Sequence, residues 1–217
     1  MGSISTIEHD VGVNIIKLSQ SCGGRQERRI IYVDQKNEMF MSPVSPIRGA
    51  KTLKTAVRKI GTQVESFCWN EKCDILASIA DSRMVLDYFP HIAYIDADLM
   101  EATKEVRDSS QFGKGSEILY FCGTQILLKG ENGETLAASI TPQPAMMYDV
   151  VKKKEWKNAL HLCRISESTQ LWAMFIGLSL YHKELEFAEI ALGTIQKVDK
   201  FQQIKRIRQM PEGVVSL

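Results

Sequence analysis

The chain has 217 residues, 44% hydrophobic and 24% charged, which is ordinary globular composition with room for one large domain or two small ones. Its 27 basic and 26 acidic side chains give a net charge of +1, which excludes the concentrated positive charge that nucleic-acid binding requires. No apolar run reaches the roughly 18 residues of a membrane span, so no membrane insertion is expected.

The first predicted strands follow a pattern of strand, loop, strand, tight turn and strand. Residues 13–18 are apolar and β-branched, and residues 29–33 and 39–41 flank a hairpin loop rich in turn formers. Pro43, Pro46 and Gly49 then interrupt regular structure. The spacing of apolar residues in 51–59 fits either an outer strand or a short helix.

The next group is a cluster of three short apolar runs. Residues 64–69, 73–80 and 84–89 have the length of strands, and the gaps between them have the length of hairpin loops. Such a three-strand meander is most of one blade of a β-propeller. The Trp-Asp dipeptide typical of such blades is absent, and Tyr88 and Phe89 stand in its place.

Further short strands are predicted before the pattern changes. Residues 92–95 form another β-run, and the polar residues 96–114 are expected to be a surface excursion. Strands then resume at 118–122, 124–129 and 134–140, where Gly123 and the sequence Glu131-Asn132-Gly133 supply turns.

From Ala145 the hydrophobic period changes from two to about 3.6. Pro142 and Pro144 end the β region, and the stripes that follow predict amphipathic helices joined by short linkers. The apolar stripes lie at Met147, Val150 and Val151; Trp156, Ala159, Leu160 and Cys163; Leu171, Phe175, Leu178 and Tyr181; Phe187, Ala188, Ala191 and Ile195; and Ile204 and Ile207. The fold class is therefore β then α: propeller blades over 1–141 and stacked helical hairpins over 142–217.

The five cysteines indicate a reducing compartment. They are Cys22, Cys68, Cys73, Cys122 and Cys163. Their number is odd, no CxxC pair occurs, and the N-terminus lacks the basic start and apolar core of a secretory signal. A cytoplasmic protein is expected.

Two charged segments are weighed as sites and rejected. The acidic segment contains Asp96, Asp98, Glu101, Glu105 and Asp108. Paired carboxylates can bind Ca²⁺ or act as acid and base, but this segment lacks the glycine and spacing of a calcium loop, so a solvated linker is expected. The basic run 152–154 is followed at once by Glu155, which favours a solvated helix face.

The histidines and cysteines do not form a metal site in the sequence. His9, His91 and His182 are scattered, and His161 and Cys163 point about 200° apart on a predicted helix. Cys68 and Cys73 straddle a hairpin turn, but no second pair of ligands follows them.

The glycine-containing segments also lack a binding motif. Gly113-Lys114-Gly115-Ser116 lacks the spacing of a phosphate-binding loop, Gly23-Gly24 lacks a dinucleotide pattern, and neither GxSxG nor HExxH occurs. No catalytic, cofactor-binding or metal residue is therefore predicted. Trp69, Trp156 and Trp172 are predicted to pack in the core.

Three stretches resemble one known family, the eighty-kilodalton WD-repeat subunits of intraflagellar transport complex B. Residues 29–43 and 60–96, with VESFCW around Trp69, look like the last blades of that family's second propeller. Residues 117–164, with WKNALHLCR, resemble its propeller exit and first solenoid helix. Residues 171–207, with AEIALGTIQKVDK, are similar to the helices that follow. The resemblance is collinear.

The resemblance implies WD-repeat-like blades and a TPR-like solenoid. It implies a non-enzymatic scaffold of the intraflagellar transport particle that supports cilium assembly and cargo transport. Its partners would be other complex B subunits, and its location the cilium or ciliary basal body. Family members are several times longer, so the chain is expected to be a fragment, a truncated gene product or a short form. Its open propeller edge predicts self-association and poor folding in isolation.

Two other functions stay open at this point. A coat or vesicle-trafficking adaptor has a similar propeller-then-solenoid build and would bind peptides at a propeller face. A hydrolase on a propeller scaffold would need polar residues clustered at a central channel, and about two blades cannot close such a channel.

Overall fold

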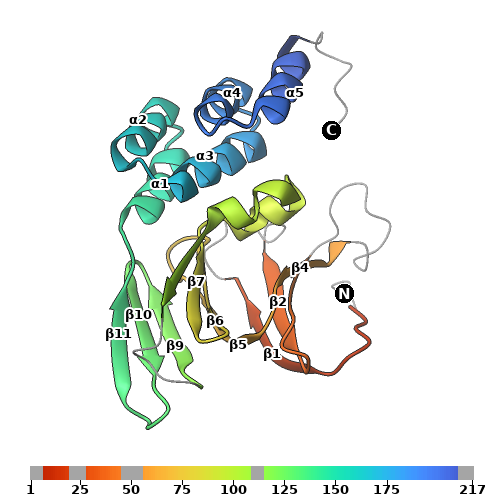
Figure 1. Ribbon diagram of the computed structural model, residues 1–217, viewed down its shortest axis with the longest axis vertical. Helices are drawn as coiled ribbons and strands as arrows, with labels where there is room; N and C mark the ends of the chain where they lie inside the picture. Colours follow the sequence, from red (N-terminus) through yellow and green to blue (C-terminus); the bar gives the residue numbers. More distant parts are fainter. Residues whose placement is uncertain (1–6, 20–27, 45–55, 109–114, 210–217) are drawn as a thin grey trace, which may run out of the picture. The chain divides into compact units, whose positions relative to one another are not determined.

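The computed structural model describes residues 7–19, 28–44, 56–108 and 115–209 (Figure 1). The chain divides into two compact units, residues 1–90 with 104–142, and residues 91–103 with 143–217. The first unit contains the described β-strands and the second contains the described α-helices. That residues 1–141 and 142–217 fold as separate domains stays a prediction.

The first sheet is a four-stranded antiparallel meander. Its strands pair in chain order and are β1 (Val13–Leu18), β2 (Arg29–Asp34), β3 (Met39–Pro43) and β4 (Arg58–Gly61). Successive side chains of a strand point to opposite faces, so Ile31, Val33 and Met41 share one face and are fully buried. On the other face Tyr32 stacks on Phe40. Of the predicted segment 51–59, the structure describes 56–59, and only Arg58 and Lys59 are strand, as the start of β4.

The second and third sheets repeat this layout. The second comprises β5 (Val64–Trp69), β6 (Leu76–Ala80), β7 (Arg83–Asp87) and β8 (Lys104–Asp108), again paired in chain order. The third comprises β9 (Glu117–Cys122), β10 (Gln125–Lys129) and β11 (Thr135–Ser139). Gly133 has a φ of +80° in the predicted turn between β10 and β11.

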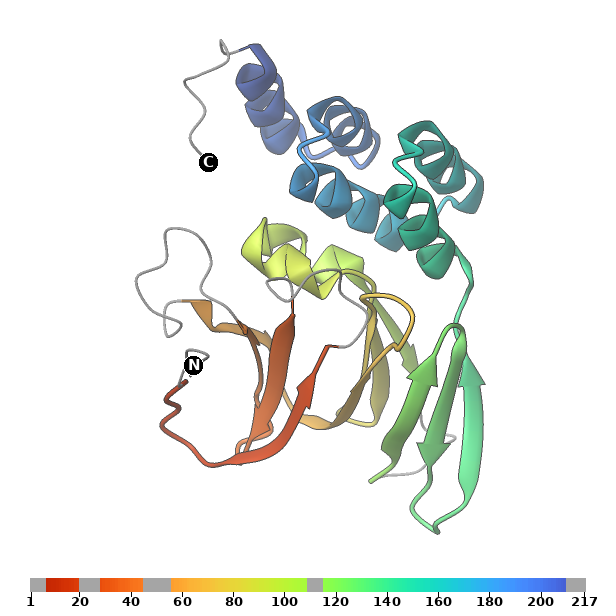
Figure 2. The ribbon, with the colours of Figure 1, turned by 180° about the vertical axis from the view of Figure 1, so that it is seen from behind.

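The three sheets are consecutive blades of a partial propeller. The first strands of neighbouring sheets contact each other, β1 against β5 and β5 against β9 (Figure 2). Phe67 on β5 and Phe121 on β9 are fully buried. The Ser66 hydroxyl also accepts a hydrogen bond from the Ile118 backbone N–H at 2.9 Å, which joins β5 to β9. The predicted fold class is confirmed.

Two predictions between β7 and β9 are wrong. Residues 92–95 are not a strand but most of a 3₁₀ turn, η3 (Pro90–Tyr94), because Pro90 fixes a turn conformation and the Ile95 N–H bonds back to the Ile92 carbonyl. The polar residues 104–108 are not an excursion but the outer strand β8. An outer strand has little apolar surface to bury, so its composition resembles that of a loop.

Five α-helices are described in the second unit. They are α1 (Gln143–Lys152), α2 (Trp156–Ser166), α3 (Thr169–Tyr181), α4 (Leu185–Thr194) and α5 (Val198–Gln209). All five predicted stripes fall on these helices, except that Ile195 lies one residue beyond the end of α4. Ser168 caps α3, since its hydroxyl accepts a hydrogen bond from the Leu171 N–H. Helices α1 and α3 lie side by side in one layer, and α2 and α4 in the next (Figures 1 and 2).

The segment between β7 and β8 belongs to the helical unit. It holds η4 (Ala97–Leu99) and η5 (Glu101–Thr103), and η5 packs against α3. Ile92, Leu99 and Thr103 are fully buried. A stretch inserted between two strands of one blade is thus part of the packing of the helices.

Candidate interaction surfaces

Part of the acidic segment is held against the helices. The Lys200 ammonium on α5 contacts the Asp96 carboxylate and lies 3.1 Å from Oδ2 of Asp98. Burial alone would lower the pKa of Lys200, but its hydrogen bonds to the two carboxylates outweigh that effect and raise it. The expectation of a solvated linker is therefore wrong for Asp96, which is held on the helices.

The remaining acidic residues of that segment differ in exposure and in hydrogen bonding. Glu101 and Asp108 are exposed, whereas the Glu105 carboxylate accepts a hydrogen bond from the Tyr88 hydroxyl. The carboxylate also raises the pKa of Tyr88, second to the effect of burial. Arg107 donates to the Ser139 carbonyl at 2.7 Å, so β8 is tied to the end of β11.

Two of the four histidines, His91 and His182, contact the same ring, that of Tyr181. Nε2 of His9 lies 3.2 Å from Oδ2 of Asp34. The His91 and Tyr181 rings meet edge-on with centroids 4.8 Å apart, and the centroids of the His182 and Trp156 rings are 5.5 Å apart. His161 is exposed on α2. Among the described residues no group of three or more His, Cys, Asp or Glu side chains could hold a metal ion.

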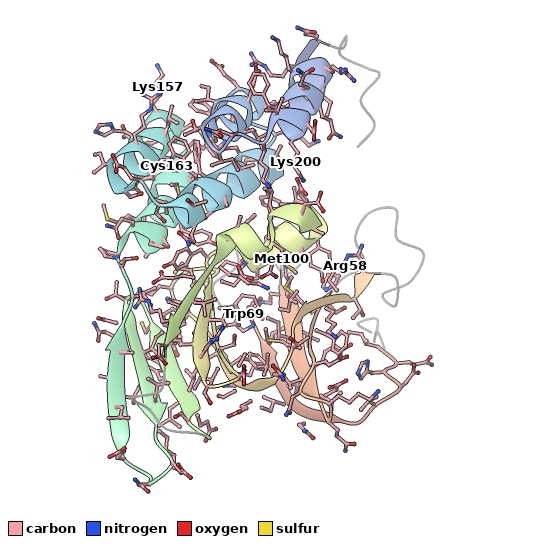
Figure 3. All side chains as sticks on the ribbon, viewed as in Figure 1. Arg58, Trp69, Met100, Lys157, Cys163 and Lys200 are labelled. Atoms are coloured by element: carbon pink, nitrogen blue, oxygen red, sulfur yellow. The ribbon has the colours of Figure 1, made fainter. Side chains whose placement is uncertain are left out.

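The described cysteines are free thiols. Cys68 is on β5, Cys73 is in the β5–β6 loop, and Cys122 ends β9. Cys163 is fully buried between helices (Figure 3), and burial raises its pKa to about 12. Cys22, Gly23-Gly24 and Gly113-Lys114 lie outside the described residues, whereas Gly115 occupies a turn with a φ of +75°.

The tryptophans are core residues, as predicted. Trp69 is 4% exposed, and Trp156 and Trp172 are each 7% exposed. Trp156 packs against Phe175 and Phe187 with ring centroids 6.3 and 6.0 Å apart. The aromatic cluster holds α2, α3 and α4 together.

One uncovered apolar surface is the outward face of the third sheet. Ile118 and Ile126 are buried, whereas Leu119, Tyr120 and Leu127 are 37–44% exposed. Tyr120 pairs with Leu127, and the register shift between β9 and β10 beside this pair lets the adjacent Leu119 be exposed as well. The sheet order ends at β11, and no described strand pairs with its outer edge. We call these three side chains the blade face. Apolar patches of this kind are typical of protein–protein contacts.

A second surface lies where α1 passes into α2 and α3 passes into α4. The side chains of Lys154, Trp156, Lys157 and Phe187 line a hollow of about 350 Å³ there, together with Glu155 and Asn158. Lys157 lies on the outer side of α2 (Figure 3). We call this the turn surface. The predicted solvated helix face at 152–154 is exposed, but α1 ends at Lys152, so Lys153 and Lys154 belong to a turn.

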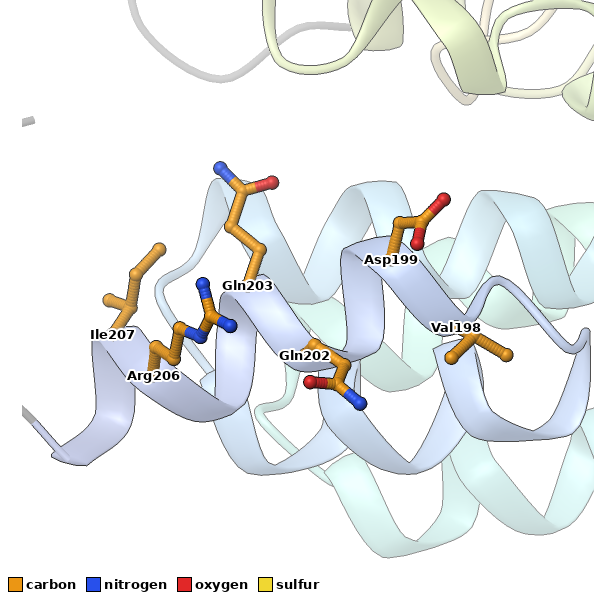
Figure 4. Close-up of a pocket in the computed structure, with 6 residues that line it drawn as sticks. All are labelled: Val198, Asp199, Gln202, Gln203, Arg206 and Ile207. Carbon is orange, nitrogen blue, oxygen red and sulfur yellow. The ribbon is translucent and has the colours of Figure 1, made fainter.

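A third surface follows the last described helix. Val198, Asp199, Gln202, Gln203, Arg206 and Ile207 line a hollow of about 690 Å³ along α5 (Figure 4). Val198 is 61% exposed. The lining mixes both signs of charge with amides, which is typical of a helix face open to another chain segment or to water.

Sequence reasoning missed the special backbone of the turn surface. Lys154 and Lys183 have φ values of +60° and +62°, a left-handed conformation that disfavours any residue except glycine. In each case the next residue is a glutamate whose N–H bonds back into the preceding helix.

No described helix is long and apolar enough to cross a membrane.

Two family models match the chain: the IFT80 second beta-propeller over residues 1–143, and the IFT80/172/WDR35/WDR19 TPR domain over residues 171–216. Intraflagellar transport protein 80 homolog of Mus musculus is 28% identical over 211 residues, and so is that of Rattus norvegicus. Each match covers 97% of this chain and 26% of the relative, so the chain spans about a quarter of the length of these relatives.

Proposed function

Because this chain belongs to the IFT80 second beta-propeller family, we propose that it is a non-enzymatic scaffold subunit of the intraflagellar transport complex B particle. The collinear match to a propeller and then a TPR domain supports this proposal most directly. In this role the chain supports cilium assembly and the transport of ciliary cargo by presenting surfaces to partner subunits.

The exposed side chains support binding rather than chemistry. The blade face offers three large apolar residues, and the turn surface offers aromatic rings bordered by lysines. Side chains of these kinds anchor protein–protein interfaces. The polar groups weighed as catalytic or metal-binding in the sequence have structural partners instead, such as Lys200 for Asp96 and Tyr88 for Glu105.

We place the protein at the cilium and its basal body, with other complex B subunits as its partners. Self-association through the open propeller edge is part of the proposal, because β11 offers unpaired backbone groups beside an apolar face. A chain that spans about a quarter of its relatives would contribute one binding segment of the larger assembly.

The test is co-purification of the tagged chain from ciliated cells, with complex B subunits identified by mass spectrometry. The wild-type chain should recover them, and Leu127→Glu on the blade face should recover fewer. Val106→Glu, which changes an exposed apolar strand residue on β8 outside the blade face, is the matched control and should behave as wild type. Recovery of none of these subunits, or location at the Golgi or endosomes, would overturn the proposal and favour a coat adaptor.

A further inference from the structure

Helices α2 and α4 begin side by side at the turn surface. Trp156 is the first residue of α2, Phe187 lies in the first turn of α4, and their rings stack with centroids 6.0 Å apart. Neither preceding glutamate, Glu155 or Glu184, caps its helix with a side-chain hydrogen bond. The first-turn backbone N–H groups and the positive dipole ends of both helices therefore point toward the same edge.

The charge around this edge is positive. Five exposed lysines surround it, against three glutamates: Lys152, Lys153, Lys154, Lys157 and Lys183, with Glu155, Glu184 and Glu186. The Glu155 carboxylate accepts a hydrogen bond from the Asn158 amide at 2.9 Å, which directs it toward its own helix. Lys154 and Lys157 are the two basic residues that line the hollow itself.

The backbone at two of these lysines is strained. Lys154 and Lys183 occupy equivalent left-handed positions in the two turns, where glycine would be more stable by about 1 kcal/mol. Glu167 and Gln196 have the same left-handed conformation at the other two helix–helix turns, so it is the usual way in which these helices end. At the two turns of this edge the residue in that position is a lysine, which adds to the positive charge.

We propose that the turn surface is a docking site for an acidic peptide segment of a partner protein, one large apolar side chain of which enters the hollow beside Trp156 and Phe187. The lysines and helix N-termini attract the carboxylates, and the stacked rings contact the apolar residue. This deepens the proposed scaffold function by naming the chemistry of one partner.

The shape of the site favours a peptide over an anionic membrane. Trp156 is 7% exposed and Phe187 is half-buried, so both form the floor of a hollow and do not protrude. A membrane-surface site would project its aromatic residues into the bilayer and would carry few carboxylates. Here three glutamates lie among the lysines, which suits a peptide whose charges can be matched one by one.

The experiment uses the whole chain and a fluorescein-labelled acidic octapeptide, DEEFDEEL, with binding followed by fluorescence anisotropy. Wild type should bind it in low salt and bind more weakly as salt is raised. The charge-reversed double variant Lys154→Glu/Lys157→Glu should lose at least about tenfold in affinity. The matched control Lys197→Glu/Lys205→Glu reverses two exposed lysines elsewhere on the helical unit and should leave the affinity unchanged.

Two further probes complete the test. A peptide with serine in place of phenylalanine should bind more weakly, and vesicles of phosphatidylcholine with phosphatidylserine should not bind. The proposal is overturned if wild type does not bind the acidic peptide, if the control pair weakens it equally, or if vesicles bind and the peptide does not. Loss of peptide binding with co-purification intact would overturn this inference and leave the scaffold function standing.

Discussion

Arg29 and Asp74 form an ion pair that joins the first sheet to the second. Nη1 of Arg29 lies 3.0 Å from Oδ2 of Asp74, and the two side chains are only 6% and 13% exposed. Arg29 is on β2 and Asp74 is in the loop between β5 and β6. The two residues are 45 positions apart in the sequence, and their ion pair links two consecutive blades.

Removing one member of this pair should destabilise the propeller unit strongly. Arg29→Met removes the cation of a mostly buried ion pair, so we expect the free energy of unfolding to fall by about 3 kcal/mol. Urea unfolding followed by tryptophan fluorescence measures the change. Lys59→Met is the control, because the Lys59–Glu38 pair is 43% and 34% exposed and should contribute less than about 1 kcal/mol. Equal losses in the two variants would contradict the prediction.

The Asp34 carboxylate organises the turn between β2 and β3. Its Oδ1 accepts hydrogen bonds from the Lys36 and Glu38 backbone N–H groups at 2.9 Å, and His9 lies 3.2 Å from Oδ2. Asp34→Ala should cost about 2 kcal/mol of unfolding free energy, since it leaves these donors unpaired. Asp34→Asn keeps an acceptor oxygen and should cost less. A similar loss for both variants would show that the backbone bonds are unimportant.

Asp34 also predicts that the free energy of unfolding depends on pH in the acid range. Burial by itself raises the pKa of Asp34, but the hydrogen bonds from Glu38, His9 and Lys36 outweigh it and lower the pKa below its ordinary value of 3.8. Its stabilising contribution is therefore present above pH 3.8 and is lost as the pH falls below that value. The difference in unfolding free energy between wild type and Asp34→Asn should shrink over that range. A difference independent of pH would contradict this.

The sequence indicates the strands and helices that bury a regular stripe. Residues 64–69 and the stripe that begins at Trp156 have a clear period of two or 3.6, and both formed as predicted. Strand β8 was missed because an outer strand buries too little apolar surface to show that period. The pairing of Arg29 with Asp74 depends on how two blades meet, and no local pattern contains that information.

The turn surface shows the same division between local and tertiary information. Its exposed lysines and buried tryptophan could be anticipated from composition and spacing. That Trp156 would stack on Phe187 depends on the packing of α2 against α4. The left-handed backbone of Lys154 was hidden because the sequence has lysine where glycine is the usual indicator.

The inserted segment 91–103 should be needed for the stability of the helices. Leu99 is fully buried in the helical unit although it lies between β7 and β8. Leu99→Ala should lower the unfolding free energy of the helices by about 3 kcal/mol, measured by circular dichroism during thermal or urea unfolding. Ile165→Ala, at a site that is 67% exposed in the same unit, should have almost no effect. A normal helical transition in the Leu99 variant would contradict the assignment of this segment.

The cysteines should react in an order set by burial. Cys163 is fully buried and its pKa is raised to about 12, so about one thiol in ten thousand is ionised at pH 8. Iodoacetamide should therefore label Cys122, which is partly exposed, long before Cys163 in the folded chain. Peptide mapping by mass spectrometry over time measures both sites, and unfolding in urea should remove the difference. Early labelling of Cys163 would show that α2 and α3 open readily.

Glycine at the strained turn should stabilise the helical unit. Lys154→Gly relieves a left-handed lysine at φ +60°, so we expect a gain of about 1 kcal/mol in unfolding free energy, measured by urea unfolding followed by circular dichroism. Lys153→Gly is the control, because Lys153 lies one residue earlier and outside the left-handed region. This variant relieves no backbone strain, and it should lower the stability of the folded chain slightly because glycine raises the conformational entropy of the unfolded chain.

The Lys154→Gly variant also separates stability from binding. If the lysine is kept for its charge, the more stable variant should bind the acidic octapeptide less well than wild type, and Lys183→Gly should behave in the same direction. A variant that gains stability and keeps full peptide affinity would show that the strain serves no purpose at this surface. Loss of stability would instead show that contacts of the lysine stem outweigh the backbone strain.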